Sequence, residues 1–391
     1  MMLPESDLRE VRKLFPHLTQ GNLYLNHAST GPLSVHVIEA IHQYLERHAV
    51  GEIDTYHHDV VMVEECRQRV ARLINAESTE RVAFLGNTTD AINVVASGLP
   101  WKSGDRILLP SVEFPANVYP YLNQRLNGAE IDFLETPDGC VTPETIASHL
   151  TPSTRLVALS AIQFLSGYRA DLDSIGYLCR QRNVIFAVDG IQAVGAVNID
   201  VQRMKIDVLS AGAQKWQLSP QGTGFLYLTE EIQARILQRS LGWLGVADPW
   251  NFHDFGQPLA SGARRYEGGS QNMQGLWGMH AALATHLETG MERIEPHLLE
   301  ITGLLIKRLQ EIDGIALVTP SVDAARGGIV TVRCNTPFDA TGVYKNLLSR
   351  RVTVAIREGL IRYSPHFYNS IDDMNCAADA TAECIRQQMN S

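Results

Sequence analysis

Residues 205–228 read KIDVLSAGAQKWQLSPQGTGFLYL, and the rest of the chain is interpreted from this stretch. The apolar run Ile206–Ser210 predicts a buried strand, and the small residues Ala211–Ala213 predict a loop that leads to Lys215. A turn-rich piece and a second apolar run, Phe225–Leu228, complete a predicted strand–loop–strand hairpin. Most lysines are solvated. A lysine desolvated behind such small residues loses affinity for its proton and can form a Schiff base with a carbonyl.

A second signal lies upstream, in residues 183–192, NVIFAVDGIQ. An unbroken apolar strand here ends in Asp189 and a glycine, as expected for a buried parallel strand whose carboxyl end faces a ligand. An aspartate at a strand tip beside the loop that carries Lys215 is the pair that a pyridoxal phosphate (PLP) enzyme needs. The lysine binds the cofactor, and the carboxylate keeps its pyridine nitrogen protonated so that the ring accepts electrons.

Three ordered motifs carry a family resemblance: VDGIQ at 188–192, AGAQKW at 211–216 and PQGTGFLYL at 220–228. Together they resemble the class V aminotransferase family of fold-type I PLP enzymes, and the resemblance runs from about Tyr24 to Asn369. That family includes cysteine desulfurases, selenocysteine lyases, isopenicillin N epimerases, kynureninases and small-molecule aminotransferases. The resemblance implies pyridoxal 5'-phosphate as cofactor.

Composition indicates an ordinary soluble enzyme, with 391 residues, 45% hydrophobic and 19% charged. The net charge of −10 and the lack of a basic block argue against nucleic acid as a partner. No apolar run approaches the ~20 residues of a membrane span. The first residues, MMLPESDLREVRKLF, have no apolar export core, so we expect a cytoplasmic protein. The six cysteines form no CxxC pair, so neither a metal site nor a disulfide framework is indicated.

Apolar runs near 82, 106, 131, 156, 184, 206 and 225 alternate with helical segments. This alternation predicts an α/β fold with a mostly parallel seven-stranded sheet, which is the large domain of a fold-type I PLP-dependent transferase in the family resemblance. Further strand-like runs near 315, 329 and 352 predict a small C-terminal α+β domain. We therefore expect an N-terminal segment 1–30 packed near the active site, a large PLP-binding domain 31–290 and a small domain 291–391.

The remaining cofactor contacts are predicted from strand ends and from the resemblance. Thr88 is a natural helix N-cap, and with Thr89 it offers hydroxyl and backbone N–H groups to a phosphate. The resemblance places Phe114 against the face of the cofactor ring. Many relatives bind the phenolic oxygen with an asparagine near Gln163 and Phe164; this sequence lacks it, so Gln192, three residues after Asp189, is the better candidate for that contact. In RRYEGGSQN, residues 264–272, Ser270 resembles a phosphate donor from the neighbouring subunit, which implies a homodimer with shared active sites. The predicted cofactor-binding set is Thr88, Thr89, Phe114, Asp189, Gln192, Gln214, Lys215 and Ser270.

The expected substrate is an amino acid. Arg362 matches the family arginine that grips a substrate carboxylate through a two-pronged salt bridge. The extended piece before Pro32 lies over the active site in the family, so Asn26, His27 and Ala28 are candidates for contact with substrate.

Lys215 is expected to take the Cα proton of the substrate. Transamination, epimerisation and C–S β-elimination all remain open after that step. In the family, cysteine desulfurases carry a nucleophilic cysteine on a loop shortly before the carboxylate-binding arginine. Residues 351–362 contain no cysteine, so the resemblance implies that the chain is not a persulfide-forming cysteine desulfurase. Gln214 beside Lys215 resembles alanine–glyoxylate-type aminotransferases and favours an aminotransferase. A non-catalytic binding protein is the alternative of another class, but binding alone needs no Schiff-base lysine.

Overall fold

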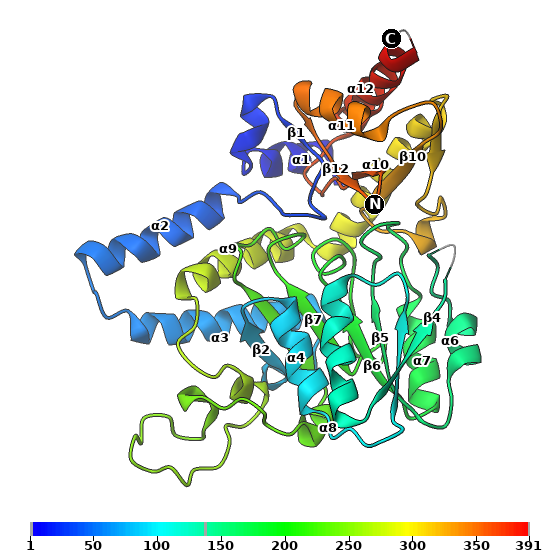
Figure 1. Ribbon diagram of the computed structural model, residues 1–391. Coiled ribbons are helices and arrows are strands. Elements are labelled where there is room, and N and C mark those ends of the chain that lie inside the picture. Colours follow the sequence, from blue (N-terminus) through cyan, green and yellow to red (C-terminus); the bar gives the residue numbers. More distant parts are fainter. Residues whose placement is uncertain (1–2, 137–138, 390–391) are drawn as a thin grey trace.

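The computed structural model describes residues 3–136 and 139–389, and a seven-stranded sheet forms the centre of its larger part (Figure 1). The strand order is β2-β8-β7-β6-β5-β3-β4. Within the described residues β8 alone runs antiparallel to its neighbours. The predicted α/β fold with a mostly parallel seven-stranded sheet is therefore confirmed. Its strands are β2 Val82–Leu85, β3 Arg106–Pro110, β4 Glu130–Leu134, β5 Thr154–Ser160, β6 Ile185–Asp189, β7 Val208–Gly212 and β8 Gly224–Leu228.

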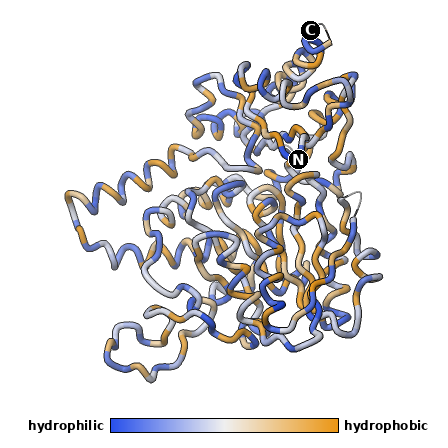
Figure 2. The backbone as a smooth tube through the Cα atoms, in the orientation of Figure 1, coloured by the Kyte–Doolittle hydropathy of each residue, from blue (hydrophilic) through white to orange (hydrophobic). Residues whose placement is uncertain are grey.

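Helices cover both faces of this sheet because its central strands are apolar on both faces. On β6, Phe186 and Val188 belong to one core cluster, whereas Ile185 and Ala187 belong to the other. Figure 2 shows hydrophobic stretches running through these central strands. Helices α4 Thr88–Gly98, α5 Tyr119–Leu122 and α8 Glu230–Arg235 pack on the Ile185 face, and α3 Tyr56–Leu73, α6 Pro143–His149, α7 Leu172–Gln181 and α9 Met273–Thr289 pack on the other.

The predicted hairpin is formed by β7 and β8, which pair antiparallel from Val208↔Leu228 to Gly212↔Gly224. The small residues Ala211 and Gly212 continue β7, so their predicted assignment to a loop is wrong. The reason is steric, since a Cβ on Gly224 would lie 2.9 Å from the carbonyl oxygen of Ala211. Two facing glycines therefore let the strands stay paired up to the point where the chain turns toward Lys215.

A four-stranded antiparallel sheet of order β12-β13-β10-β9 forms the second, smaller part of the molecule. The short strand β1 pairs in parallel with β11, which ties the N-terminal segment to this C-terminal part. The predicted domain boundaries at 30 and 291 stay a prediction. The elements are β1 Leu23–Tyr24, α2 Val35–Val50, α10 Met291–Gln310, β9 Ile315–Leu317, β10 Val330–Cys334, α11 Ala340–Ser349, β11 Val352–Thr353, β12 Ala355–Arg357, β13 Leu360–Tyr363 and α12 Ile371–Met389.

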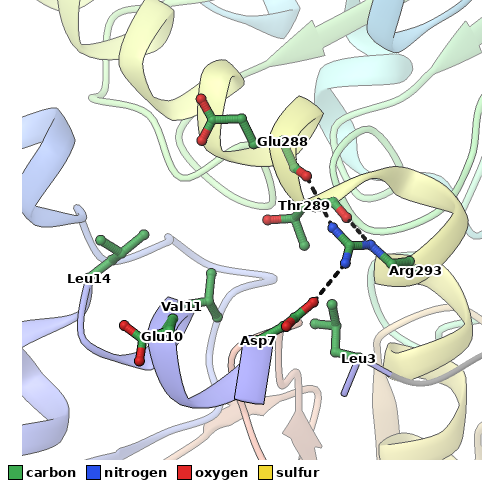
Figure 3. Close-up of a pocket in the computed structure, with 8 residues that line it drawn as sticks. All are labelled: Leu3, Asp7, Glu10, Val11, Leu14, Glu288, Thr289 and Arg293. Carbon is green, nitrogen blue, oxygen red and sulfur yellow. Dashed lines mark hydrogen bonds and ion pairs between the residues drawn. The ribbon is translucent and has the colours of Figure 1, made fainter. Parts of the chain in front are cut away.

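The N-terminal helix α1, Glu5–Arg12, docks beside the junction of α9 and α10 (Figure 3). Arg293 donates to Asp7 at 2.8 Å and to the carbonyl oxygens of Thr289 and Glu288. The cavity beside these contacts, about 390 Å³, holds none of the predicted site residues. Among the helices that the structure describes, none is long and apolar enough to cross a membrane.

Candidate active site

A cavity of about 350 Å³ brings most of the predicted site residues together. It lies where β2, β6 and β7 end, which is the edge of a parallel sheet at which ligands bind. The cavity is lined by Ala28, Ser29, Asn87, Thr88, Thr89, Phe114, Ala116, Phe164, Asp189, Ile191, Gln192, Gln214, Lys215, Arg357 and Arg362.

Asp189 is the last residue of β6 and is only 3% exposed. One carboxylate oxygen accepts a hydrogen bond from the backbone N–H of Ile191 at 2.9 Å. Burial raises the pKa of Asp189 to about 6, although this hydrogen bond and the charge of Lys215 oppose the shift. Asp189 is a buried carboxylate that lines an open cavity, and a buried charge needs a partner of opposite sign. A protonated ring nitrogen bound in the cavity would be such a partner.

Lys215 follows β7 and faces the same cavity. Burial lowers the pKa of its amine to about 8, Asp189 opposes this shift, and the positive charges of Arg362 and Arg357 add to it. Its Nζ lies 5.8 Å from the centroid of the Phe114 ring. Within residues 3–136 and 139–389 this amine has no hydrogen-bond or salt-bridge partner. The lysine is therefore suited to covalent chemistry with a carbonyl.

The start of α4 forms a cradle for an anion. Asn87, not Thr88, is the N-cap, because the Asn87 side chain accepts from the N–H of Asp90 at 2.9 Å. The predicted N-cap role of Thr88 is thus wrong. Its hydroxyl oxygen instead accepts from the N–H of Gly212 at 2.8 Å. A Cβ on Gly212 would lie 2.6 Å from Oε1 of Gln214 and 3.1 Å from the hydroxyl oxygen of Thr88, so a larger residue here would crowd this cradle. Its chemistry fits the phosphate of PLP.

Phe114 and Gln192 line the cavity in different ways. Phe114 is exposed, and its ring meets Phe164 edge to face at 5.2 Å, which leaves an aromatic surface for a flat ring to stack on. The Gln192 amide donates to the carbonyl of Ala28 at 3.0 Å and accepts from the indole N–H of Trp216 at 2.7 Å. Because the protein already holds both ends of this amide, its contact with a phenolic oxygen stays a prediction.

Arg362 lies on β13 and is 2% exposed. Its guanidinium donates to the carbonyl of Phe164 at 2.6 Å and to the hydroxyl of Ser29 at 2.9 Å, and its Nε has no partner in the part of the chain that the structure describes. Burial, with a smaller contribution from Arg357, lowers its pKa to about 10. Among the described residues no carboxylate pairs with it. A buried guanidinium without an acid fits a substrate carboxylate.

Three predicted residues do not line this cavity. His27 is fully buried, with Nδ1 2.8 Å from the carbonyl of Ser364 and Nε2 2.7 Å from the hydroxyl of Tyr368. Asn26 lies next to it, and only Ala28 of this trio reaches the cavity. Ser270 lines a different hollow of the same chain. Its predicted role concerned a second copy, so that role stays a prediction.

Sequence reasoning missed several residues of the site. Ser29, Phe164 and Arg357 line the cavity, and Glu113 lies behind it, where its carboxylate accepts from the N–H and hydroxyl of Ser160. Burial raises the pKa of Glu113 to about 7. Ser29 directly follows the suspected segment and Glu113 directly precedes Phe114. Their positions next to residues that the sequence had already singled out are the signals that could have pointed to Ser29 and Glu113.

Comparisons with known proteins place these features in context. A family model described as "Aminotransferase class-V" matches residues 23–369. The chain is 28% identical over 397 residues to a "Probable cysteine desulfurase" of Methanothermobacter thermautotrophicus, with 96% of this chain and 97% of that protein covered. It is 28% identical over 384 residues to "Uncharacterized aminotransferase YcbU" of Bacillus subtilis, covering 97% and 98%. A solved complex between the cystine C–S lyase C-DES and its reaction product cysteine persulfide matches with TM-score 0.86 and 25% identity, over 94% and 99%.

These findings overturn the prediction that the chain is not a persulfide-forming cysteine desulfurase. Similar proteins carry the name cysteine desulfurase, and a matching structure holds a persulfide. The prediction rested on the lack of a cysteine in residues 351–362. In the C-DES complex the persulfide is the reaction product itself, cysteine persulfide. A missing cysteine on one loop is therefore no ground for excluding persulfide chemistry.

Proposed function

The chain belongs to the class V aminotransferase family and is a PLP-dependent enzyme, and we propose that it breaks the Cβ–S bond of a cysteine-type amino acid. The observation that carries the proposal is the convergence of Lys215, Asp189 and Arg362 on one cavity. The names of similar proteins, cysteine desulfurase and cystine C–S lyase, indicate the sulfur-containing side chain.

Each part of the cofactor has candidate residues in the cavity. Thr88 and Thr89, at the start of α4, would hold the phosphate, Phe114 would cover one face of the ring, and Asp189 would accept a hydrogen bond from the ring nitrogen. Lys215 would supply the amine. When bound, pyridoxal phosphate withdraws electrons from Cα of an attached amino acid and so weakens the bonds around that carbon.

The residues of the chain orient the substrate and move its proton. Arg362 would bind the α-carboxylate through two N–H groups, which fixes Cα relative to Lys215. The lowered pKa of Lys215, about 8, leaves an appreciable fraction of free amine near neutral pH, so that Nζ is suited to take the Cα proton. Arg357 adds positive charge at the rim, which suits a departing thiolate or the second carboxylate of cystine.

The test is an incubation of the purified enzyme with L-cysteine, L-cystine and L-alanine, each with and without a 2-keto acid and a thiol reductant. Sulfide, persulfide sulfur, alanine, pyruvate and ammonia are measured, with Lys215→Ala as the inactive control. The proposal expects release of sulfur with either alanine or pyruvate as the carbon product. Transfer of the amino group to the keto acid without any release of sulfur would refute it.

Transamination is the second candidate function. It is favoured by the Gln214–Lys215 pair and by the similarity to "Uncharacterized aminotransferase YcbU". The keto-acid arm of the same experiment decides between the two. No observation of the site favours epimerisation. A non-catalytic binding protein does not explain why the Lys215 amine is buried near Asp189 with no partner among the described residues.

We also propose that two copies pair as a cytoplasmic homodimer. Trp243, Trp250, Phe252 and Phe255 are exposed on the segment that precedes Ser270, and an apolar group of this size favours a protein partner. Pairing would let Ser270 of one copy approach the phosphate cradle of the other. The support would be a dimer in light scattering together with weaker PLP binding in Ser270→Ala. A monomer with full PLP affinity would contradict the pairing.

A further inference from the structure

Two buried histidines converge on the carbonyl of Trp216, the residue that follows Lys215. The carbonyl oxygen of Trp216 lies 2.7 Å from Nε2 of His366 and 2.9 Å from Nε2 of His286. Both histidines are fully buried. The contact also needs a glycine on the other side, since a Cβ on Gly195 would lie 2.4 Å from the same oxygen. Three segments that are distant in sequence therefore fix the position of one carbonyl.

The hydrogen-bond network assigns the proton of His366. The backbone N–H of Phe367 donates to Nδ1 of His366 at 2.7 Å, so Nδ1 is an acceptor. In the neutral ring the proton must then sit on Nε2, where it points to the carbonyl of Trp216. His286 differs, because its Nδ1 lies 3.0 Å from the carbonyl of Ala282. A neutral His286 can donate to only one of its two carbonyl partners, so His366 is the main donor.

His366 also belongs to the segment that carries the substrate-binding arginine. It follows Arg362 by four residues, and its own backbone N–H donates to the side chain of Asn369 at 2.8 Å. On the other side, the carbonyl of Lys215 accepts a hydrogen bond from the N–H of Leu218 at 3.1 Å. The imidazole thus links the segment of Arg362 to the segment of Lys215.

We propose that His366, with His286 in support, is a positioning residue that holds the Lys215 segment in a fixed relation to Arg362. It touches neither substrate nor cofactor and acts through the carbonyl of Trp216. Loss of this hydrogen bond lets the Lys215 peptide shift, which lowers the probability that the amine meets the cofactor carbonyl. The inference rests on Lys215 as the reactive amine but not on which bond of the substrate is broken.

The experiment compares His366→Asn with His366→Gln. Asparagine is too short to reach the carbonyl of Trp216, whereas glutamine places an amide N–H near the position of Nε2. The matched control is His297→Asn, since His297 is also buried but donates to the carbonyl of Asn369 and makes no hydrogen bond to Trp216. His286→Asn tests the supporting donor.

The readouts are the dissociation constant of PLP for the apoenzyme, the rate at which borohydride fixes PLP to Lys215, and the melting temperature. We expect His366→Asn to weaken PLP binding about three- to tenfold and to slow fixation, with a smaller effect from His286→Asn. His366→Gln should return both to within about twofold of the unaltered protein. His297→Asn should lower only the melting temperature.

Unchanged PLP affinity and fixation rate in His366→Asn would overturn the proposal. So would an equal effect of His297→Asn, which would mean that the effect passes through Asn369 or through stability and not through the carbonyl of Trp216. If His366→Asn does not fold, the order of effects in His286→Asn, His366→Gln and His297→Asn decides. These readouts need no substrate, so failure here and failure of the proposed C–S cleavage are distinguishable.

Discussion

Replacing Arg362 with alanine should abolish most of the preference of the enzyme for substrates with a carboxylate. The Arg362 side chain is 2% exposed, lines the cavity and has no acidic partner within the described residues, although its guanidinium donates to Phe164 and Ser29. A charged hydrogen bond in such a desolvated place is worth ~2–5 kcal/mol. At about 1.4 kcal/mol per factor of ten, this predicts a fall in kcat/KM of about thirty- to several-thousand-fold.

The assay measures kcat/KM with L-cysteine and L-cystine beside the PLP content of each variant. Arg362→Lys keeps the charge but not the two-pronged geometry, so its loss should be intermediate. The control is Arg333→Ala, an exposed arginine on the neighbouring strand β10. Unchanged kcat/KM in Arg362→Ala would show that the carboxylate is held elsewhere. A fall that only follows loss of PLP would show that Arg362 supports the cofactor instead.

Three further predictions concern the cofactor and stability. Asp189→Asn should lower kcat about 100-fold or more at saturating PLP, because the ring nitrogen loses its charged partner, and steady-state kinetics would check this. Phe114→Ala should weaken PLP binding about three- to tenfold in a titration of the apoenzyme, and equal affinity would argue against stacking. Acidification should destabilise the fold. Six histidines have a lowered pKa against three carboxyls with a raised one, and the pKa of His27 falls to about 3. The six histidines stabilise the folded protein fully above their unfolded pKa of 6.5. Below that pH the folded protein loses up to about 1.4 kcal/mol of stability per pH unit for each histidine. Urea unfolding at pH 7.5 and 5.5 should show this loss, and equal stability at both values would contradict it.

Much of the fold could be predicted because the signals are local. The apolar runs that end at Asp189 and before Lys215 are buried strands, and parallel strands place their ends at one edge. That rule alone brings Asp189, Lys215 and Thr88 together. The boundary of β7 was missed because small residues can either break a strand or let two strands approach, and only the pairing partner Gly224 decides.

Other parts of the site depend on contacts between distant segments, which no local pattern encodes. Arg362 donates hydrogen bonds to Ser29 and Phe164, which lie more than 130 residues away from it in the sequence. The contact of His366 with Trp216 also joins distant segments. Both Asn87 and Thr88 have side chains that can cap a helix, so the sequence does not decide between them. Asn87 is the N-cap because its backbone is extended and the helix begins at Thr88. The reaction was misjudged because a missing cysteine says nothing about the residues that break the bond.

The identity of the reactive lysine is tested most directly by reducing the PLP-loaded enzyme with borohydride and mapping the modified residue by mass spectrometry. Lys215 is expected to carry the pyridoxyl group, because it is the lysine that lines the cavity with Asp189 and Arg362 and its pKa is lowered to about 8. The Lys215→Ala variant should yield no adduct. A modified lysine at another position, or a protein that takes up no PLP, would contradict the assignment of this cavity as the active site.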